Sequence, residues 1–269
     1  MIIANTIIFS EGVTSMVSIL GIKVEEDKDY SIVTSYAGML GHFEFWRHLG
    51  MPEVIDRTVH ICGEQGWMDR QVVETIVMIN TAGGDCVADV DKLEADGGLG
   101  RVFRNCECSG LSRRAFKARF RRGRTRAFPA QTQIHAFLNE CHNPSEEGKR
   151  EPGKAFIPQP NQHLLSLRGL NTHLIGQAQA RRPCKTATLD CDATLVESHS
   201  RNALWSYKHF PGYQPYNVYW AEQDMVLHSE FRDGNVPADY DLLRVFKEAV
   251  DMLPAGVTIR NVLRVRMPT

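Results

Sequence analysis

The repeat of apolar residues changes along this chain, from every third or fourth residue in the first half to every second residue in the second half. After Asp69, which we expect to cap a helix, apolar residues recur at helical spacing until Gly83-Gly84. The segment 186–197 instead alternates apolar and polar residues, as a strand with one buried face does. Because a helical repeat cannot bury one face of a strand, the two halves need different architectures. The sequence therefore predicts an α+β or α/β chain, helical first and sheet-containing afterwards.

Residues 143–160 separate the two halves. This stretch is polar and charged and contains four of the twelve prolines, a composition typical of a linker. We therefore predict three parts: a mostly helical region over 1–142, a linker over 143–160 and a second domain over 161–269.

The formal net charge of −1 hides an uneven distribution of charge. Between residues 101 and 126 there are ten basic residues and one acidic residue, whereas acidic residues dominate after residue 221. Ser112 is expected to cap a basic helix in this stretch. Such a cluster could be only a solvated surface, but its self-repulsion favours binding to phosphates. The candidate DNA-binding residues are Arg113, Arg114, Lys117, Arg119, Arg121, Arg122, Arg124 and Arg126.

The second half predicts the element order β-β-β-α-β. The strands are expected over 186–197, 213–225, 226–231 and 257–265, with a helix over 238–253 before the last strand. Antiparallel strands followed by one crossover helix form the opening of a ribonuclease-H-like mixed sheet.

Two aspartates on the first of these strands are the candidate site. Alternation places Asp190 and Asp192 on the same face. Paired carboxylates suit a divalent cation such as Mg²⁺ or Mn²⁺, and two such ions can drive phosphodiester chemistry. The plain alternative is a solvent-facing strand with two surface carboxylates.

The sequence shows no convincing targeting segment and no apolar stretch long enough to span a bilayer. Its seven cysteines are irregularly spaced, unlike a disulfide framework. We therefore expect a cytoplasmic protein with free thiols and no membrane partner.

Several motifs together resemble those of bacterial insertion-sequence transposases of the DDE class. They are TLDCDATLVESH at 188–199, Trp220-Ala-Glu-Gln223 and HSEFRDGNVPA at 228–238, and the similarity runs from about residue 34 to residue 260. The resemblance implies cutting of double-stranded DNA at element ends and joining of the 3′ hydroxyl to a target. It also implies a magnesium pair held by two aspartates and a glutamate. The family's Asp-x-Thr step favours Asp192 as the first aspartate, with Asp190 second.

One departure from the family pattern bears on activity. The family has an Arg-Ser-Asp or Arg-Gly-Asp motif after the crossover helix, whereas here Arg264 is followed by Val265-Arg266, and no later residues supply the glutamate. The expectation is a C-terminally truncated copy, with an incomplete ribonuclease-H-like domain, that binds DNA, associates with the nucleoid when bound and does not transpose. Two alternatives are a nuclease completed by a second copy, and a DNA-binding regulator or inhibitor of a full-length transposase.

Overall fold

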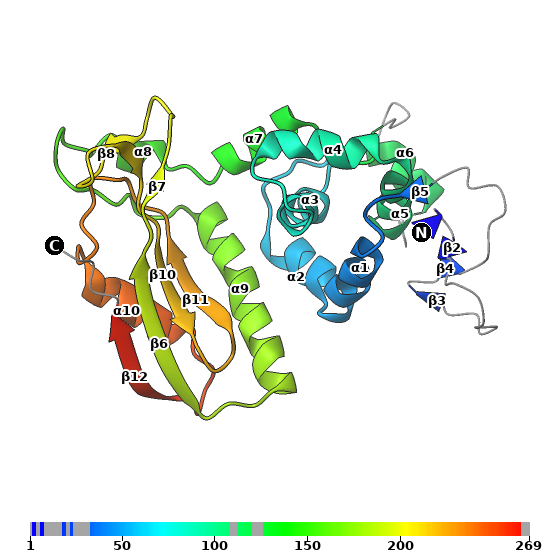
Figure 1. The fold of residues 1–269 in the computed structure, drawn as a ribbon. Helices are drawn as coiled ribbons and strands as arrows, with labels where there is room; N and C mark the ends of the chain where they lie inside the picture. Colours follow the sequence, from blue (N-terminus) through cyan, green and yellow to red (C-terminus); the bar gives the residue numbers. More distant parts are fainter. Residues whose placement is uncertain are drawn as a thin grey trace. The chain divides into compact units, whose positions relative to one another are not determined.

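A computed structural model describes residues 2–3, 6–7, 18–19, 22–23, 33–107, 112–119 and 126–264 (Figure 1). The chain divides into two compact units, residues 1–142 and 143–269. Among the described residues, no helix is long and apolar enough to cross a membrane.

The first unit is built mainly from short helices. They are α1 (Met39–His48), α2 (Met51–Thr58), α3 (Asp69–Thr81), η1 (Val87–Asp89), α4 (Val90–Ala95), α5 (Gly97–Glu107), α6 (Arg113–Arg119) and α7 (Gln131–Asn139). Five two-residue strands were not predicted: β1 (Ile2–Ile3), β2 (Thr6–Ile7), β3 (Ser18–Ile19), β4 (Ile22–Lys23) and β5 (Val33–Thr34). They pair in the orders β2-β1-β5 and β3-β4.

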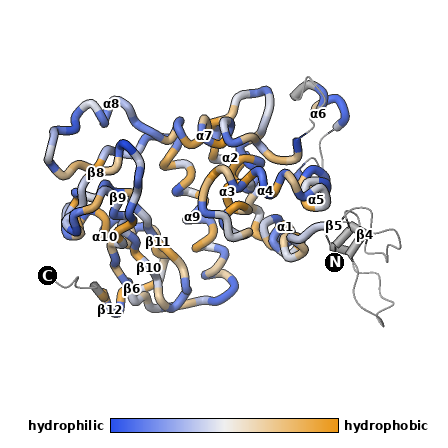
Figure 2. Tube along the Cα trace, turned by 45° about the horizontal axis from the view of Figure 1, so that its top comes forward, coloured by the Kyte–Doolittle hydropathy of each residue, from blue (hydrophilic) through white to orange (hydrophobic). Residues whose placement is uncertain are grey.

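Aromatic and aliphatic side chains fill the core of the first unit. Phe43, Phe103 and Phe128 are fully buried, and the rings of Phe103 and Phe128 stack with centroids 4.5 Å apart. Figure 2 shows the contrast between α3, which carries apolar residues, and α6, which is hydrophilic. The helical repeat read from the sequence therefore reflects burial of one side of each helix.

One predicted helix boundary in this unit is wrong. Asp69 lies in the first turn of α3 instead of capping it, and its Oδ1 accepts hydrogen bonds from the backbone N–H groups of Ile61 and Cys62. Helix α5 begins at Gly97, directly after Asp96. The carboxylate of Asp96 makes this start favourable, because its Oδ1 accepts from the backbone N–H of Leu99 at 2.8 Å.

The second unit carries a four-stranded mixed sheet in the order β11-β10-β6-β12. Its strands are β6 (Thr186–Ala193), β10 (Tyr216–Trp220), β11 (Met225–Glu230) and β12 (Thr258–Arg264). β10 is antiparallel to β6 and β11, and β12 is parallel to β6. The helices are α8 (Pro144–Glu147), α9 (Gln162–Arg181) and α10 (Leu242–Asp251). A smaller sheet in the order β7-β9-β8 joins Val196–Glu197, Pro211–Tyr213 and Leu204–Trp205.

The main sheet has the predicted mixed architecture, but several boundaries differ. The first strand, β6, ends at Ala193 instead of residue 197, and β7 belongs to the smaller sheet. Strand β10 begins at Tyr216 instead of residue 213. The turn between β10 and β11 falls at 221–224 instead of after residue 225, because the Glu222 carboxylate accepts hydrogen bonds from both N–H and Oγ1 of Thr188, each at 2.7 Å. Helix α10 begins at Leu242 instead of about Ala238, because Asp241 before it has a left-handed backbone with φ of 51°. Residues 238–241 form a turn.

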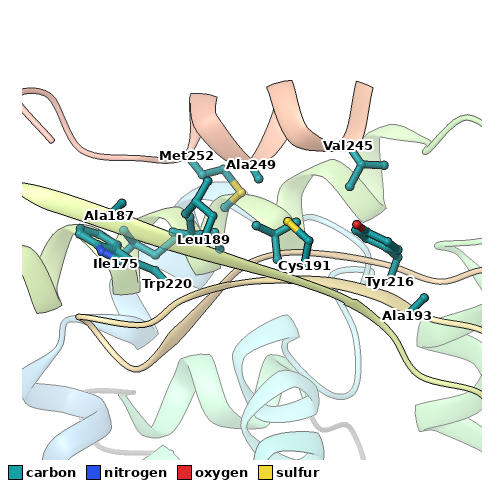
Figure 3. Close-up of a cluster of buried hydrophobic side chains, with 12 residues drawn as sticks. Ile175, Ala187, Leu189, Cys191, Ala193, Tyr216, Trp220, Val245, Ala249 and Met252 are labelled. Atoms are coloured by element: carbon teal, nitrogen blue, oxygen red, sulfur yellow. The ribbon is translucent and has the colours of Figure 1, made fainter. Parts of the chain in front are cut away.

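One face of the sheet packs against α10 and forms the core of the second unit (Figure 3). Leu189 and Cys191 of β6 point toward this helix, where Val245 and Ala249 are fully buried. Burial along β6 alternates residue by residue. The intervening residues, including both aspartates, therefore lie on the opposite face.

The segment 143–160 packs onto the second unit. Arg150 forms an ion pair with Asp233 at 2.6 Å, and Asn235 Nδ2 donates to the backbone oxygen of Lys154 at 3.2 Å. Both contacts come from the HSEFRDGNVPA motif, so part of that motif holds this segment in place.

Candidate functional site

Strand β6 places Asp190 and Asp192 side by side on one face of the sheet. Asp190 pairs with Tyr219 of β10 and with Leu263 of β12, and Asp192 pairs with Asn217 of β10. Residues two apart on a strand lie roughly 6.6 Å apart along it. The structure thus brings the two predicted site residues together on a central strand, whose neighbours fix the position of their backbone.

The two carboxylates have different surroundings. Asp190 Oδ1 is buried and has no hydrogen-bond partner among the described residues. Asp192 Oδ2 accepts a hydrogen bond from Thr194 Oγ1 at 3.0 Å, and its side chain is partly exposed. A buried carboxylate oxygen without a partner is costly, and a bound cation would remove that cost.

These residues fit a divalent metal ion in chemistry but supply only part of a ligand set. Carboxylate oxygens are the donors that Mg²⁺ prefers, and water commonly fills its remaining positions. No group of three or more metal-ligating side chains occurs within the described part of the chain. The described residues of β12 include no carboxylate. This face can therefore hold a cation through two aspartates, and the two-metal arrangement needs further ligands.

The predicted basic helix is present as α6. Ser112 Oγ accepts from the backbone N–H of Ala115 at 3.1 Å, which confirms the predicted cap. The side chains of Arg113, Arg114 and Lys117 are exposed. Three cationic side chains within two turns of a helix make a strongly positive surface.

Of the other predicted DNA-binding cations, Arg126 is already paired, and the remaining side chains lie outside the described residues. Arg126 forms an ion pair with Asp91 at 3.0 Å, and its Nε donates to the backbone oxygen of Phe128 at 3.3 Å. A phosphate would have to compete for this side chain. Arg119 is the last residue of α6, and its side chain is not described. The described residues do not include Arg121, Arg122 and Arg124.

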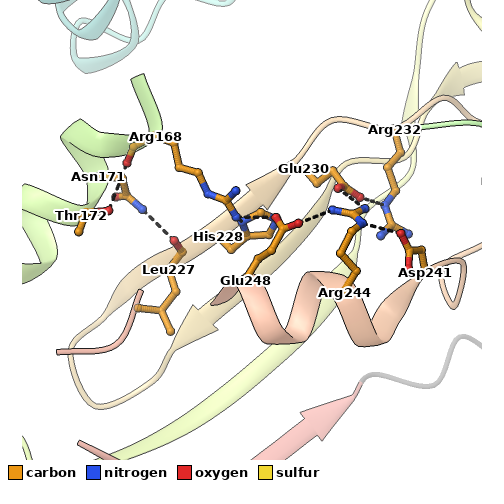
Figure 4. A network of polar contacts seen from close by, with 10 residues as sticks. All are labelled: Arg168, Asn171, Thr172, Leu227, His228, Glu230, Arg232, Asp241, Arg244 and Glu248. Atoms are coloured by element: carbon orange, nitrogen blue, oxygen red, sulfur yellow. Dashed lines mark hydrogen bonds and ion pairs between the residues drawn. The ribbon is translucent and has the colours of Figure 1, made fainter. Parts of the chain in front are cut away.

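A polar network that sequence reasoning missed holds together β11, α10 and α9 (Figure 4). Glu230 binds both Arg232, at 2.8 Å, and Arg244, at 2.6 Å. The Arg232 side chain is fully buried, with its guanidinium 4.7 Å from the centre of the Tyr216 ring. The motif FRDGNV had signalled family resemblance, and the structure shows that its arginine has a packing role.

Gly234 in the same motif lies where no side chain fits. A Cβ there would come within 2.6 Å of the Gly212 oxygen and 2.7 Å of the Leu204 oxygen. Gly234 therefore allows the motif's turn to pack directly against the small sheet β7-β9-β8.

His228 lies in the middle of this network, between α9 and α10. Burial and the neighbouring Arg168 guanidinium lower the pKa of His228 to about 4, and the opposing effect of Glu248 is weaker. Arg168 Nη2 donates to His228 Nδ1 and also binds Glu248 Oε2 at 2.7 Å. The ring is therefore neutral at pH 7, with its proton on Nε2, because a protonated Nδ1 would face a guanidinium.

A cavity of about 550 Å³ opens beside the network, between segment 157–160, α9, β11 and α10. Its walls are largely apolar, and the guanidinium groups at its edge are already paired: Arg168 with Glu248, and Arg244 with Glu230 and Glu248. This cavity is therefore unsuited to phosphate, unlike the exposed cations of α6.

A family model described as "Transposase DDE domain group 1" matches residues 18–264. The match spans both units and covers far more than half of the chain, so the chain belongs to this family. No curated protein and no solved structure matches the chain.

Proposed function

We propose that this chain, a member of the transposase DDE domain family, binds double-stranded DNA through α6 and binds a divalent cation at Asp190 and Asp192. The observation that carries the metal proposal is the buried Oδ1 of Asp190, which lacks a partner among the described residues and lies beside a second carboxylate on the same face. Family membership supports metal-dependent cutting at element ends as the reaction to which this site belongs.

The role of each residue follows from its surroundings. A bound Mg²⁺ or Mn²⁺ would supply the charge that stabilises the attacking and leaving oxygens of a phosphodiester. Asp190 and Asp192 would hold it, with Thr194 fixing the orientation of Asp192 by its hydrogen bond. The arginines and lysine of α6 would hold the DNA backbone by pairing with phosphates without reading the base sequence.

We infer that this chain alone cuts DNA weakly or not at all. Among the described residues this site has two carboxylates, fewer than the triad of the family, and Leu263 is the β12 residue that pairs with Asp190. This favours, as a second candidate function, a DNA-binding regulator that inhibits a full-length transposase. A second copy or a full-length transposase that supplied further ligands would restore cleavage, and mixing experiments separate these cases.

Binding of Mn²⁺, followed by its paramagnetic resonance signal, tests the metal proposal. We expect saturable binding to the intact chain, lost in Asp190→Asn and in Asp192→Asn. Asp251→Asn is the matched control, because Asp251 is exposed at the end of α10, on the other side of the sheet. Binding that survives both site substitutions would refute the proposal.

A further inference from the structure

The first unit contains two buried glutamates whose carboxyl groups meet. Glu74 on α3 and Glu107 at the end of α5 are each 2% exposed. The two carboxyl groups interact directly, and among the described residues Oε2 of each is buried without a hydrogen-bond partner. Two carboxylates cannot bond to each other without a proton, and two buried negative charges in contact repel strongly.

The positive charges around this pair are distributed unequally. Arg70 Nε lies 3.4 Å from Glu107 Oε2, and Arg47 Nη2 lies 3.9 Å from Glu107 Oε1. No ion pair within the described residues involves Glu74. The two arginines therefore pair with Glu107 and not with Glu74, so Glu74 is the member that carries the proton.

We propose that Glu74 and Glu107 share one proton inside the first unit, and that this proton joins α3 to α5. The Glu74 carboxyl group donates to the Glu107 carboxylate, so one hydrogen bond satisfies both orphaned oxygens. Loss of the proton at alkaline pH breaks this hydrogen bond between α3 and α5. Because Glu107 is the last residue of α5, this hydrogen bond holds the end of α5 against α3.

The other groups around the pair do not replace this proton. Arg47 from α1 also donates to the Cys106 backbone oxygen, and Arg70 also binds Asp56 of α2 at 2.8 Å. Burial raises the pKa of the Cys106 thiol to about 12, so it stays neutral. Burial, and then the contact with Glu107, raise the pKa of Glu74 well above its ordinary value, in agreement with the geometry.

The sign of the pH effect follows from this arrangement. The folded chain keeps a proton on Glu74 that the unfolded chain releases above about pH 4.5. Stability from this group is therefore complete below that pH and is lost as the pH rises toward the folded pKa of Glu74. Within that window the unfolding constant rises up to tenfold for each pH unit.

The test compares Glu74→Gln with the intact chain, because a glutamine amide donates to Glu107 at any pH. We expect the unfolding constant of the intact chain, relative to that of Glu74→Gln, to rise up to tenfold per pH unit above about pH 5. Glu53→Gln, an exposed change on α2, should keep the pH dependence of the intact chain. A constant ratio between the intact chain and Glu74→Gln would overturn the proposal.

Two further measurements separate the shared proton from simple packing. The infrared difference between the intact chain and Glu74→Gln at neutral pH should contain the carbonyl band of one protonated carboxylic acid, and its absence would overturn the proposal. Glu107→Gln should raise the unfolding constant on the order of a hundredfold more than Glu74→Gln, because it leaves Arg70 and Arg47 without their carboxylate. Equal effects of the two substitutions would contradict the assigned location of the proton.

Discussion

Acidification should weaken the second unit through His228. The pKa of His228 is lowered from 6.5 to about 4, mainly by burial and then by Arg168. Between these values the unfolded chain binds a proton that the folded chain excludes, so stability is lost as the pH falls below 6.5. Each pKa unit corresponds to about 1.4 kcal/mol, which gives a loss of about 2 kcal/mol between pH 7 and pH 5. The unfolding constant should rise roughly thirtyfold over that interval.

The assay must report on the second unit, because both units contain buried tryptophans. Urea unfolding at pH 7 and pH 5, followed by hydrogen-exchange mass spectrometry of peptides from β10 and β11, meets this need. His228→Gln keeps an acceptor for Arg168 but removes the titrating ring, so its stability should change about 2 kcal/mol less between the two pH values. The exposed His199→Gln serves as control. Equal losses in the intact chain and in His228→Gln would refute the reasoning.

Two substitutions in the FRDGNV motif test its packing role by urea unfolding. Arg232→Met removes a fully buried partner of Glu230 and should cost about 3 kcal/mol; an unchanged midpoint would contradict the role of this ion pair. Gly234→Ala should cost about 1–3 kcal/mol, because its Cβ would lie 2.6 Å from the Gly212 oxygen. Gly176→Ala on α9, where a Cβ meets nothing within 4 Å, should be neutral or stabilising; equal losses for the two glycines would exclude the steric explanation.

Local sequence patterns predicted the features that depend only on residues close in sequence, such as strand β6 and the Ser112 cap. Alternation identified β6, although not its end at Ala193, and placed Asp190 and Asp192 on one face, because a strand's period of two does not depend on the rest of the fold. The cap at Ser112 followed in the same way, since a hydroxyl reaches a backbone N–H three residues later.

The features that the sequence could not predict depend on contacts between residues far apart in the chain. The turn at 221–224 contains no glycine or proline, and the hydrogen bonds of Glu222 to Thr188 on β6 hold it. Arg168 meets Glu248 80 residues away, and no periodic pattern encodes that pair. The FRDGNV motif resembles the family's motif, but its packing role depends on partners outside it, such as Gly212 and Leu204 against Gly234.

Association with labelled duplex DNA across a salt series tests the central claim most directly. Each phosphate neutralised by the protein contributes about −0.9 to the slope of log affinity against log salt. Replacing Arg113, Arg114 and Lys117 together with alanine should flatten the slope by up to about 2.7. In the same samples, Mg²⁺ should produce no more than weak cleavage by this chain alone. Affinity that does not change with salt, or a slope unchanged in the triple variant, would contradict the account.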